Sequence, residues 1–252
     1  MIPGLCIVVP LTHPKKYMER LGCMLRSARR QTVDVDVVIS LAWPIVDRPE
    51  MGELLQLAVD YDAVIVPMGH PYDDFPPAFA RNLGGRWCRR EFLTFCDADS
   101  VLHPKFAEES LWELECSSVY TTIKTMMTPY PVGAPEYETD SSEAFLRYAQ
   151  AGRPAPGTGC GTVVPFKVYE ELGGLDERFI GYGPTDWDFT RRLPLERVDL
   201  TEDYGICLMH QHHDRTMQDK DPNLVESRRR NREIMEGSSD PIRNRNGWGG
   251  VK

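Results

Sequence analysis

Short apolar runs alternate with amphipathic segments along the first hundred residues of the chain. The apolar runs have the length of buried strands, and the segments between them carry apolar residues at helical spacing. This alternation is typical of βαβ units, which build a mainly parallel sheet flanked by helices, and it predicts a single α/β domain. The predicted strands are Leu5–Val9, Val35–Ile39, Ala63–Val66 and Phe92–Cys96, and the predicted helices are Lys15–Arg30, Glu53–Val59 and Pro77–Arg90.

The pattern becomes less regular after His103. A Pro- and Gly-containing stretch, 128–158, has the character of a long functional loop. We expect one domain over 1–215, with a nucleotide-binding half (1–103) and an acceptor and metal half (104–215), followed by a C-terminal helix and basic tail (216–252). The elements predicted in this half are helices Pro104–Glu115 and Phe166–Leu172 and strands Ser118–Ile123, Gly161–Val164 and Tyr204–Met209.

Composition narrows the class of protein. The 252 residues are 41% hydrophobic and 27% charged, as in ordinary globular proteins, and no apolar run approaches the ~20 residues that cross a bilayer. The amino terminus reads as a first strand because no basic region precedes its apolar run. Seven scattered cysteines argue against a disulfide framework and favour a reducing compartment, so we expect a cytoplasmic protein.

The net charge of −9 disfavours broad non-specific binding to nucleic acid, but the charge is uneven. A cluster of basic residues follows Glu226. We interpret it as a solvated helix face and a loose terminus, and contact with phosphates of a donor or an anionic acceptor is the alternative. The cluster consists of Arg228, Arg229, Arg230, Arg232, Arg243 and Arg245.

Two aspartates end the predicted strand Phe92–Cys96. Asp97 and Asp99 would project from its carboxyl end, where open α/β sheets bind ligands, and residues two apart in a strand point the same way. Two carboxylates that converge need a cation to offset their repulsion, and a divalent metal ion bound to a diphosphate would meet that need. The alternative is a polar turn without a ligand.

Three histidines lie at the end of the last predicted strand. His210 would end the strand, with His212 and His213 in the turn beyond it. Imidazole is the commonest protein ligand for transition metals, and imidazole combined with carboxylates favours Mn²⁺ over Mg²⁺ or Ca²⁺. A zinc site that includes Cys207 is the minor alternative, since it needs four converging ligands.

A third polar group lies in the segment 181–188. Thr185 and Asp188 have the spacing of a helix capping box, which leaves Asp186 free to face a cleft. A carboxylate in that place suits a general base, and Gly181 and Gly183 allow close approach to a ligand.

Arg81 and Asn82 lie on the predicted helix that leads into the Asp97–Asp99 strand. Both side chains could donate to phosphate or ribose oxygens. By themselves they favour the simpler interpretation, a surface arginine followed by the helix-breaking pair Gly84 and Gly85.

Taken in order, these segments resemble the GT-A-fold glycosyltransferases that use nucleotide sugars. RNLGGRWCRREFLTFCDADS resembles the helix, strand and Asp-x-Asp of that superfamily, and HQHH resembles its late metal-binding histidine. GGLDERFIGYGPTDWDFTRRL is similar to the acceptor-side motif of β-1,4-galactosyltransferases, polypeptide N-acetylgalactosaminyltransferases and their bacterial or phage relatives. CIVVPLTHPKKY resembles the first strand and nucleotide loop. The resemblance implies a GT-A (Rossmann-like) fold over about residues 5 to 215.

The resemblance also implies roles for individual residues. Asp99 would coordinate Mn²⁺, with Mg²⁺ possible, and Asp97 would support the metal and the ribose of the donor. Asp186 matches the base of inverting members, although Thr185 stands where those members carry an acidic residue, so the inverting outcome is favoured but open. The other implied roles are His210 as the third metal ligand with His213 as its substitute, Arg81 and Asn82 in the nucleotide site, and Pro10 and Thr12 near the base.

The resulting expectation is a glycosyltransferase that moves a sugar from a nucleoside-diphosphate sugar, with UDP-hexose favoured, to an acceptor hydroxyl. The acceptor would be a glycan, a small molecule or a modified DNA base. A nucleotidyltransferase and a non-catalytic carbohydrate- or nucleotide-binding protein are the alternatives. Neither requires a different scaffold.

Overall fold

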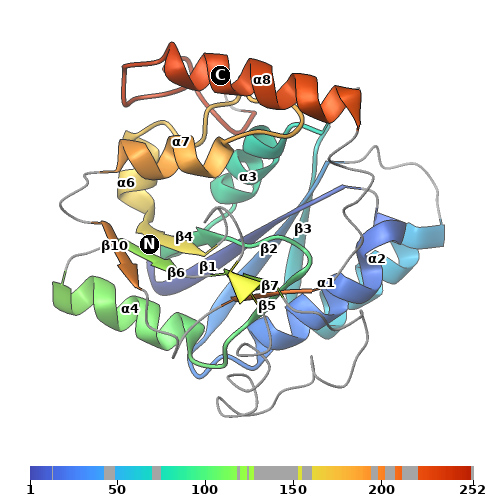
Figure 1. Cartoon of the computed structure of the whole chain (residues 1–252). Helices are drawn as coiled ribbons and strands as arrows, with labels where there is room; N and C mark the ends of the chain where they lie inside the picture. The colour runs from blue at the N-terminus through green and yellow to red at the C-terminus, as the bar shows by residue number, and fades with distance from the viewer. Residues whose placement is uncertain are drawn as a thin grey trace.

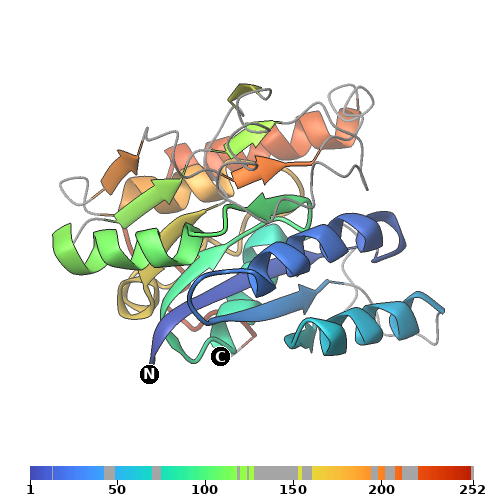
Figure 2. The ribbon, with the colours of Figure 1, turned by 90° about the horizontal axis from the view of Figure 1, so that it is seen from below.

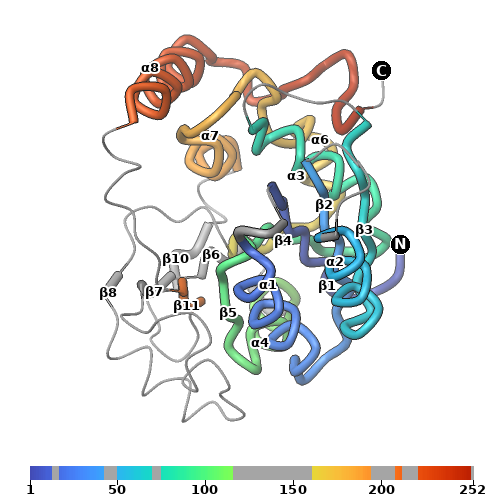
Figure 3. Tube along the Cα trace, turned by 90° about the vertical axis from the view of Figure 1, so that its right-hand side faces the viewer, coloured from blue at the N-terminus to red at the C-terminus, as the bar shows by residue number. Residues whose placement is uncertain are grey.

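The computed structural model shows a twisted central sheet between two layers of helices (Figures 1 and 3). It describes residues 1–12, 14–42, 49–69, 75–117, 120–123, 125–127, 153–154, 161–193, 198–201, 208–211 and 221–250.

The large sheet has seven strands in the order β10-β6-β9-β4-β1-β2-β3. Strands β4, β1, β2 and β3 run parallel, and β9 is antiparallel to both of its neighbours, β4 and β6. The sheet is therefore mixed and mainly parallel, as predicted. Its strands are β1 (Ile2–Leu11), β2 (Val35–Leu41), β3 (Ala63–Pro67), β4 (Arg90–Phe95), β6 (Tyr120–Ile123), β9 (Thr162–Pro165) and β10 (Val198–Thr201).

Helices cover both faces of this sheet. Figure 2 shows α4, α1 and α2 in front of one face, and Figure 3 shows α3, α6 and α7 beyond the other. The helices are α1 (Pro14–Arg29), α2 (Pro49–Asp60), α3 (Pro77–Arg86), α4 (Phe106–Ser117), α6 (Phe166–Glu171), α7 (Thr185–Arg192) and α8 (Pro222–Glu236). None of the described helices is long and apolar enough to cross a membrane.

The central strand β1 shows why the strands in the first half of the chain could be predicted from the sequence. From Leu5 to Val9 every side chain is fully buried, because helices cover both faces of the strand. The predicted helix Pro77–Arg90 is four residues too long. Tight backbone bonds from Trp87 N to Gly84 O and from Cys88 N to Gly85 O end α3 at Arg86, and Arg90 already pairs with β1.

A second, four-stranded sheet lies beside the first, in the order β5-β11-β7-β8. Three of its strands were not predicted, nor was β10 in the large sheet, because runs of two to four residues carry too little periodicity. Strand β11 overlaps the predicted strand Tyr204–Met209 at its last two residues and continues to His210. Residues 204–207 lie outside the described residues, as does most of 128–158. The strands are β5 (Ser100–Leu102), β7 (Thr125–Met127), β8 (Arg153–Pro154) and β11 (Leu208–His210).

The C-terminal segment contradicts the interpretation of a loose terminus. Arg243 is only 5% exposed, and Trp248 is buried against Tyr169 at a ring-centroid distance of 5.2 Å. Arg229 does lie on the solvated face of α8, where it bonds to Glu226 and Glu233. The basic cluster is thus divided between an exposed helix face and a buried segment.

Helix α3 approaches the sheet so closely that one of its residues must be glycine. A Cβ at Gly84 would lie 2.4 Å from Val8 Cγ1 of β1. We expect Gly84→Ala to lower the free energy of unfolding by about 1 to 3 kcal/mol through overpacking. Urea denaturation would measure this loss. Gly22→Ala in α1 is the control, because its nearest neighbour would be 3.9 Å away and alanine favours helix by about 0.5 to 1 kcal/mol. Equal effects of the two changes would contradict the prediction.

Candidate functional site

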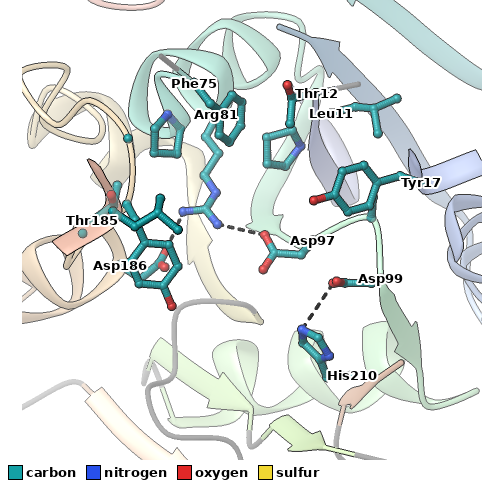
Figure 4. A pocket seen from close by; sticks show the side chains of 17 residues that line it. Leu11, Thr12, Tyr17, Phe75, Arg81, Asp97, Asp99, Thr185, Asp186 and His210 are labelled. Atoms are coloured by element: carbon teal, nitrogen blue, oxygen red, sulfur yellow. Dashed lines mark hydrogen bonds and ion pairs between the residues drawn. The ribbon is translucent and has the colours of Figure 1, made fainter. Parts of the chain in front are cut away.

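One cavity of about 410 Å³ opens at the carboxyl ends of β1 and β4 (Figure 4). Strand β1 is followed by β2 on one side, whereas β4 lies on its other side, so the order of the strands reverses between β1 and β4. Open α/β sheets bind ligands at this switch point. The cavity is lined by Pro10, Leu11, Thr12, Tyr17, Phe75, Pro77, Arg81, Asp97, Ala98, Asp99, Gly181, Tyr182, Gly183, Thr185, Asp186, His210 and Leu224.

The structure brings most of the predicted site residues to this one cavity. Seven of them lie in its wall, although they come from segments as far apart as β1 and β11. These seven are Pro10, Thr12, Arg81, Asp97, Asp99, Asp186 and His210. His213, His212 and Cys207 lie outside the described residues, so the choice among the histidines stays a prediction.

The Arg81 guanidinium connects two of the carboxylates. It donates from Nη1 to Asp186 Oδ1 at 2.6 Å and from Nη2 to Asp97 Oδ1 at 3.0 Å, and its side chain is only 7% exposed. Figure 4 shows it between the two acids. A rigid guanidinium fork suits this bridge, which joins the turn after β4 to the first turn of α7.

Asp186 lies in the first turn of α7, with 29% of its side chain exposed. Burial raises its pKa above the ordinary value for aspartate, the positive charge of Arg81 opposes this shift, and the negative charge of Asp97 adds to it. A carboxylate with a raised pKa that lines a cavity has the properties of a general base.

The predicted capping box is wrong. Helix α7 begins at Thr185, which makes no side-chain cap bond, and Pro184 occupies the cap position. Asp188 is fully buried and instead accepts from Arg192 Nε at 2.9 Å and from Arg243 Nη2 at 3.1 Å. The spacing suggested a bond to the start of the helix, but three arginines, Arg191, Arg192 and Arg243, form ion pairs with this carboxylate.

Asp97 and Asp99 face the cavity from a turn and not from the strand itself. Strand β4 ends at Phe95, and Ser100 N donates to Asp97 O at 3.0 Å to close the turn. The two carboxylates line the same cavity but have different neighbours, Arg81 for Asp97 and His210 for Asp99. Strand alternation was therefore the wrong reason for their shared direction.

The Asp99–His210 pair has the chemistry of a metal site. His210 Nδ1 lies 2.9 Å from Gln211 O, which is a hydrogen bond when Nδ1 carries the proton, and His210 Nε2 then faces Asp99 Oδ1 at 3.5 Å. A backbone carbonyl commonly orients metal-binding imidazoles in this way. Two ligands about 2.1 Å from one ion lie roughly 3 Å apart, so the pair fits a shared cation.

The described residues supply only part of a metal shell. Among them, no group of three or more His, Cys, Asp or Glu side chains converges on one point. Asp97 is bonded to Arg81 instead of joining Asp99 and His210. A metal at Asp99 and His210 would therefore take further ligands from the donor diphosphate, from water or from residues outside the described part.

Asn82 does not line the cavity, contrary to the expectation that it binds nucleotide. It is fully buried, and its side chain donates to Leu175 O at 2.9 Å and Glu177 Oε1 at 2.8 Å and accepts from Leu175 N and from the Tyr169 hydroxyl. Successive helix residues point about 100° apart, so Arg81 faces the cavity while Asn82 faces the turn at Leu175.

Sequence reasoning missed several residues of the cavity. Tyr17 of α1 lies beside the two aspartates, and burial together with the charge of Asp99 raises its pKa. Phe75 and Leu224 add apolar wall from loops and from α8. Only the position of Tyr17, in the segment compared with the nucleotide loop, offered a signal.

No family model matches the sequence, and no curated protein matches it either. Solved structures of S. aureus TarS, which is of the GT-A type, resemble it in three dimensions. TarS 1–349 in complex with UDP-GlcNAc has a TM-score of 0.60 and 11% identity over 89% of this chain and 64% of that one. Its complex with UDP has a TM-score of 0.57 and 11% identity over 83% and 60%.

A further TarS structure has a TM-score of 0.58 and 12% identity over 83% of this chain. This chain spans 37% of that structure. Together with the 60% and 64% given above, it spans less than two thirds of the length of each of these TarS structures. At such low identity the likeness shows the fold alone. The chain has the GT-A, Rossmann-like fold.

Proposed function

We propose that the chain is a metal-dependent glycosyltransferase that moves a hexose from a nucleoside-diphosphate sugar, with UDP as the nucleotide, to an acceptor hydroxyl. The observation that carries this proposal is the cavity at the β1/β4 switch point. It combines a carboxylate–imidazole pair, a buried arginine and a separate carboxylate of raised pKa. A transferase needs this division between a charge-stabilising side and a proton-accepting side.

On the donor side, Asp99 and His210 would hold the Mn²⁺ or Mg²⁺. When bound, the ion would offset the negative charge of the leaving diphosphate. Pro10 and Thr12, at the end of β1, would lie near the nucleotide base. Asp97, held by Arg81, would accept from a ribose hydroxyl.

On the acceptor side, Asp186 would accept the proton of the acceptor hydroxyl at a carboxylate oxygen. The acceptor oxygen would attack the anomeric carbon on the face opposite the diphosphate, which leaves with the bonding electrons, so the configuration inverts. Gly181 and Gly183 would let the acceptor approach the backbone beside Tyr182.

Two likenesses support this proposal. TarS, which shares the fold, has been solved with UDP and with UDP-GlcNAc. The segment 173–193 resembles the acceptor-side motif of β-1,4-galactosyltransferases and polypeptide N-acetylgalactosaminyltransferases and supports the role of Asp186. A glycan, a small molecule and a modified DNA base remain the candidate acceptors, and salt-dependent DNA binding would single out the last.

Release of nucleoside diphosphate from a panel of sugar nucleotides, with and without Mn²⁺, tests the proposal. We expect slow hydrolysis of one donor that requires Mn²⁺ and falls about 100-fold in Asp99→Asn, because several kcal/mol of charge stabilisation are lost. The amide keeps the size of the side chain and removes its charge.

Asp62→Asn is the matched control, since this aspartate is 85% exposed and its backbone φ of 52° suits asparagine. It should hydrolyse the donor at the wild-type rate. Nucleotide binding without any release would identify a binding protein instead, and release of inorganic pyrophosphate from a nucleoside triphosphate would identify a nucleotidyltransferase.

A further inference from the structure

The C-terminal segment, residues 240–250, folds back onto both helices that carry the Arg81–Asp186 bridge. Figure 3 shows it running from the end of α8 to a position beside α3 and α6. None of its residues lines the cavity, and its contacts are instead with the rear of α3 and α7. The segment therefore touches the two supports of the site and not the site itself.

On the α7 side, Arg243 lies between two buried carboxylates. Its Nε is 3.1 Å from Asp176 Oδ2, and its Nη2 donates to Asp188 Oδ1 at 3.1 Å. The carboxylates of Asp176 and Asp188 are at most 1% exposed, and Asp188 is two residues beyond Asp186 in α7. Arg243 is thus linked through Asp188 to α7, in which Arg192 holds the same carboxylate.

On the α3 side, Trp248 and Gly249 hold the helix. Arg86 donates from Nε to Trp248 O at 3.1 Å and stacks on the indole with 3.8 Å to its centroid. Gly249 N donates at 2.6 Å to Glu177 Oε1, which also accepts from Asn82, the neighbour of Arg81. A Cβ at Gly249 would lie 2.8 Å from Asn82 O, so the two backbones are in contact.

The C-terminal segment also forms hydrogen bonds with the turn at Gly173 and Gly174. Arg243 N donates to Leu172 O at 2.9 Å, and Asn244 Nδ2 donates to Gly173 O at 2.8 Å and Leu175 O at 2.6 Å. Both helices are therefore attached to one short segment through charged or backbone bonds.

We propose that the segment 240–250 sets the separation of α3 and α7 so that Arg81 and Asp186 meet, and that Arg243 is the positioning residue. The 2.6 Å contact between Arg81 and Asp186 joins residues 105 positions apart, and the segment anchors both of their helices. The catalytic consequence rests on the proposed function, because it assumes that Asp186 acts as the base.

A double-mutant cycle distinguishes positioning by Arg243 from a general contribution of Arg243 to stability, because only positioning would change the coupling between Arg81 and Asp186. The cycle of Arg81→Gln and Asp186→Asn, measured by urea unfolding, gives the coupling energy of that pair. We expect Arg243→Lys to reduce this coupling to less than half, because one ammonium cannot replace the fork that reaches both Asp176 and Asp188.

Arg245→Lys is the matched control, since Arg245 is 63% exposed, belongs to the same segment and pairs only with Asp240 in the described contacts. It should leave the coupling unchanged. Undiminished coupling in Arg243→Lys would overturn the proposal. If Arg243→Lys does not fold, the same cycle is measured in Trp248→Phe, which weakens the contact of the segment with α3. The Arg81–Asp186 coupling should again fall to less than half, and an undiminished coupling would again overturn the proposal.

Donor hydrolysis supplies the second measurement. We expect Arg243→Lys to lower kcat about tenfold or more, since small misplacements of catalytic groups have effects of this size, with the donor KM within about twofold of wild type. In the Asp186→Asn background, Arg243→Lys should cause no further loss of kcat, whereas additive losses would oppose positioning. A wild-type protein that hydrolyses no donor would refute the proposed function, and the unfolding cycle would still test the positioning.

Discussion

Asp186→Asn is expected to lower sugar transfer, or slow donor hydrolysis where no acceptor is known, by about 10² to 10⁴-fold. The amide cannot take the proton of the attacking hydroxyl, but it keeps the shape of the side chain and can still accept from Arg81. Steady-state kinetics on the best donor would measure the loss. The affinity for nucleoside diphosphate should change little, because Asp186 lies on the opposite side of Arg81 from Asp97.

The pH profile of the wild type gives a second readout of the same residue. A base must be ionised, so activity rises as pH increases through the pKa of Asp186. Because burial raises this pKa, the acidic limb should lie at higher pH than an exposed aspartate would give. Asp60→Asn, on the exposed face of α2, should leave rate and profile unchanged. An Asp186→Asn enzyme with wild-type kcat would reject Asp186 as the base.

Gly173→Ala is expected to lower the free energy of unfolding by about 2 to 5 kcal/mol. The residue has a φ of 72°, which costs alanine roughly 1 to 2 kcal/mol, and its Cβ would lie 2.0 Å from the backbone oxygen of Arg243. A backbone neighbour cannot rotate away, so the C-terminal segment must move. Urea denaturation with linear extrapolation would measure the change.

The matched control for this substitution is Gly52→Ala in α2, where an added Cβ meets nothing within 4 Å. It should leave stability unchanged or raise it by up to about 1 kcal/mol, since alanine favours helix. A Gly173→Ala protein as stable as this control would mean that the segment does not rest on the glycine turn as described.

In the motif at 173–193, some roles could be predicted from the sequence and others became visible only in the structure. Its resemblance to an acceptor-side motif drew attention to Asp186, which does line the cavity. The same stretch also holds Gly173, Asp176 and Asp188, each of which lies against Arg243 of the C-terminal segment. The interpretation of Asp188 as a capping residue failed because its carboxylate bonds to the guanidinium groups of Arg192, one turn further along α7, and of Arg243, 55 positions away in the chain.

Arg81 and Asn82 illustrate the same limit. Both were expected in the nucleotide site, yet only Arg81 faces the cavity. Adjacent helix residues point in different directions, and the direction that faces a cavity depends on how α3 packs on β1 and β2. The sequence pattern could not identify Asp186 as the partner of Arg81, because the two residues are 105 positions apart in the chain.

By itself the sequence determined the alternation of buried strands and helices in the first half, the α/β class and the polar residues that follow β4. These features depend on which side chains avoid water, and hydrophobic periodicity records that preference locally. Only the tertiary structure decided that Arg81 bridges Asp97 and Asp186, that Asp99 faces His210 and that the C-terminal segment holds α3 and α7. Those contacts join residues far apart in the chain, and a charged side chain selects its partner by distance in the folded state.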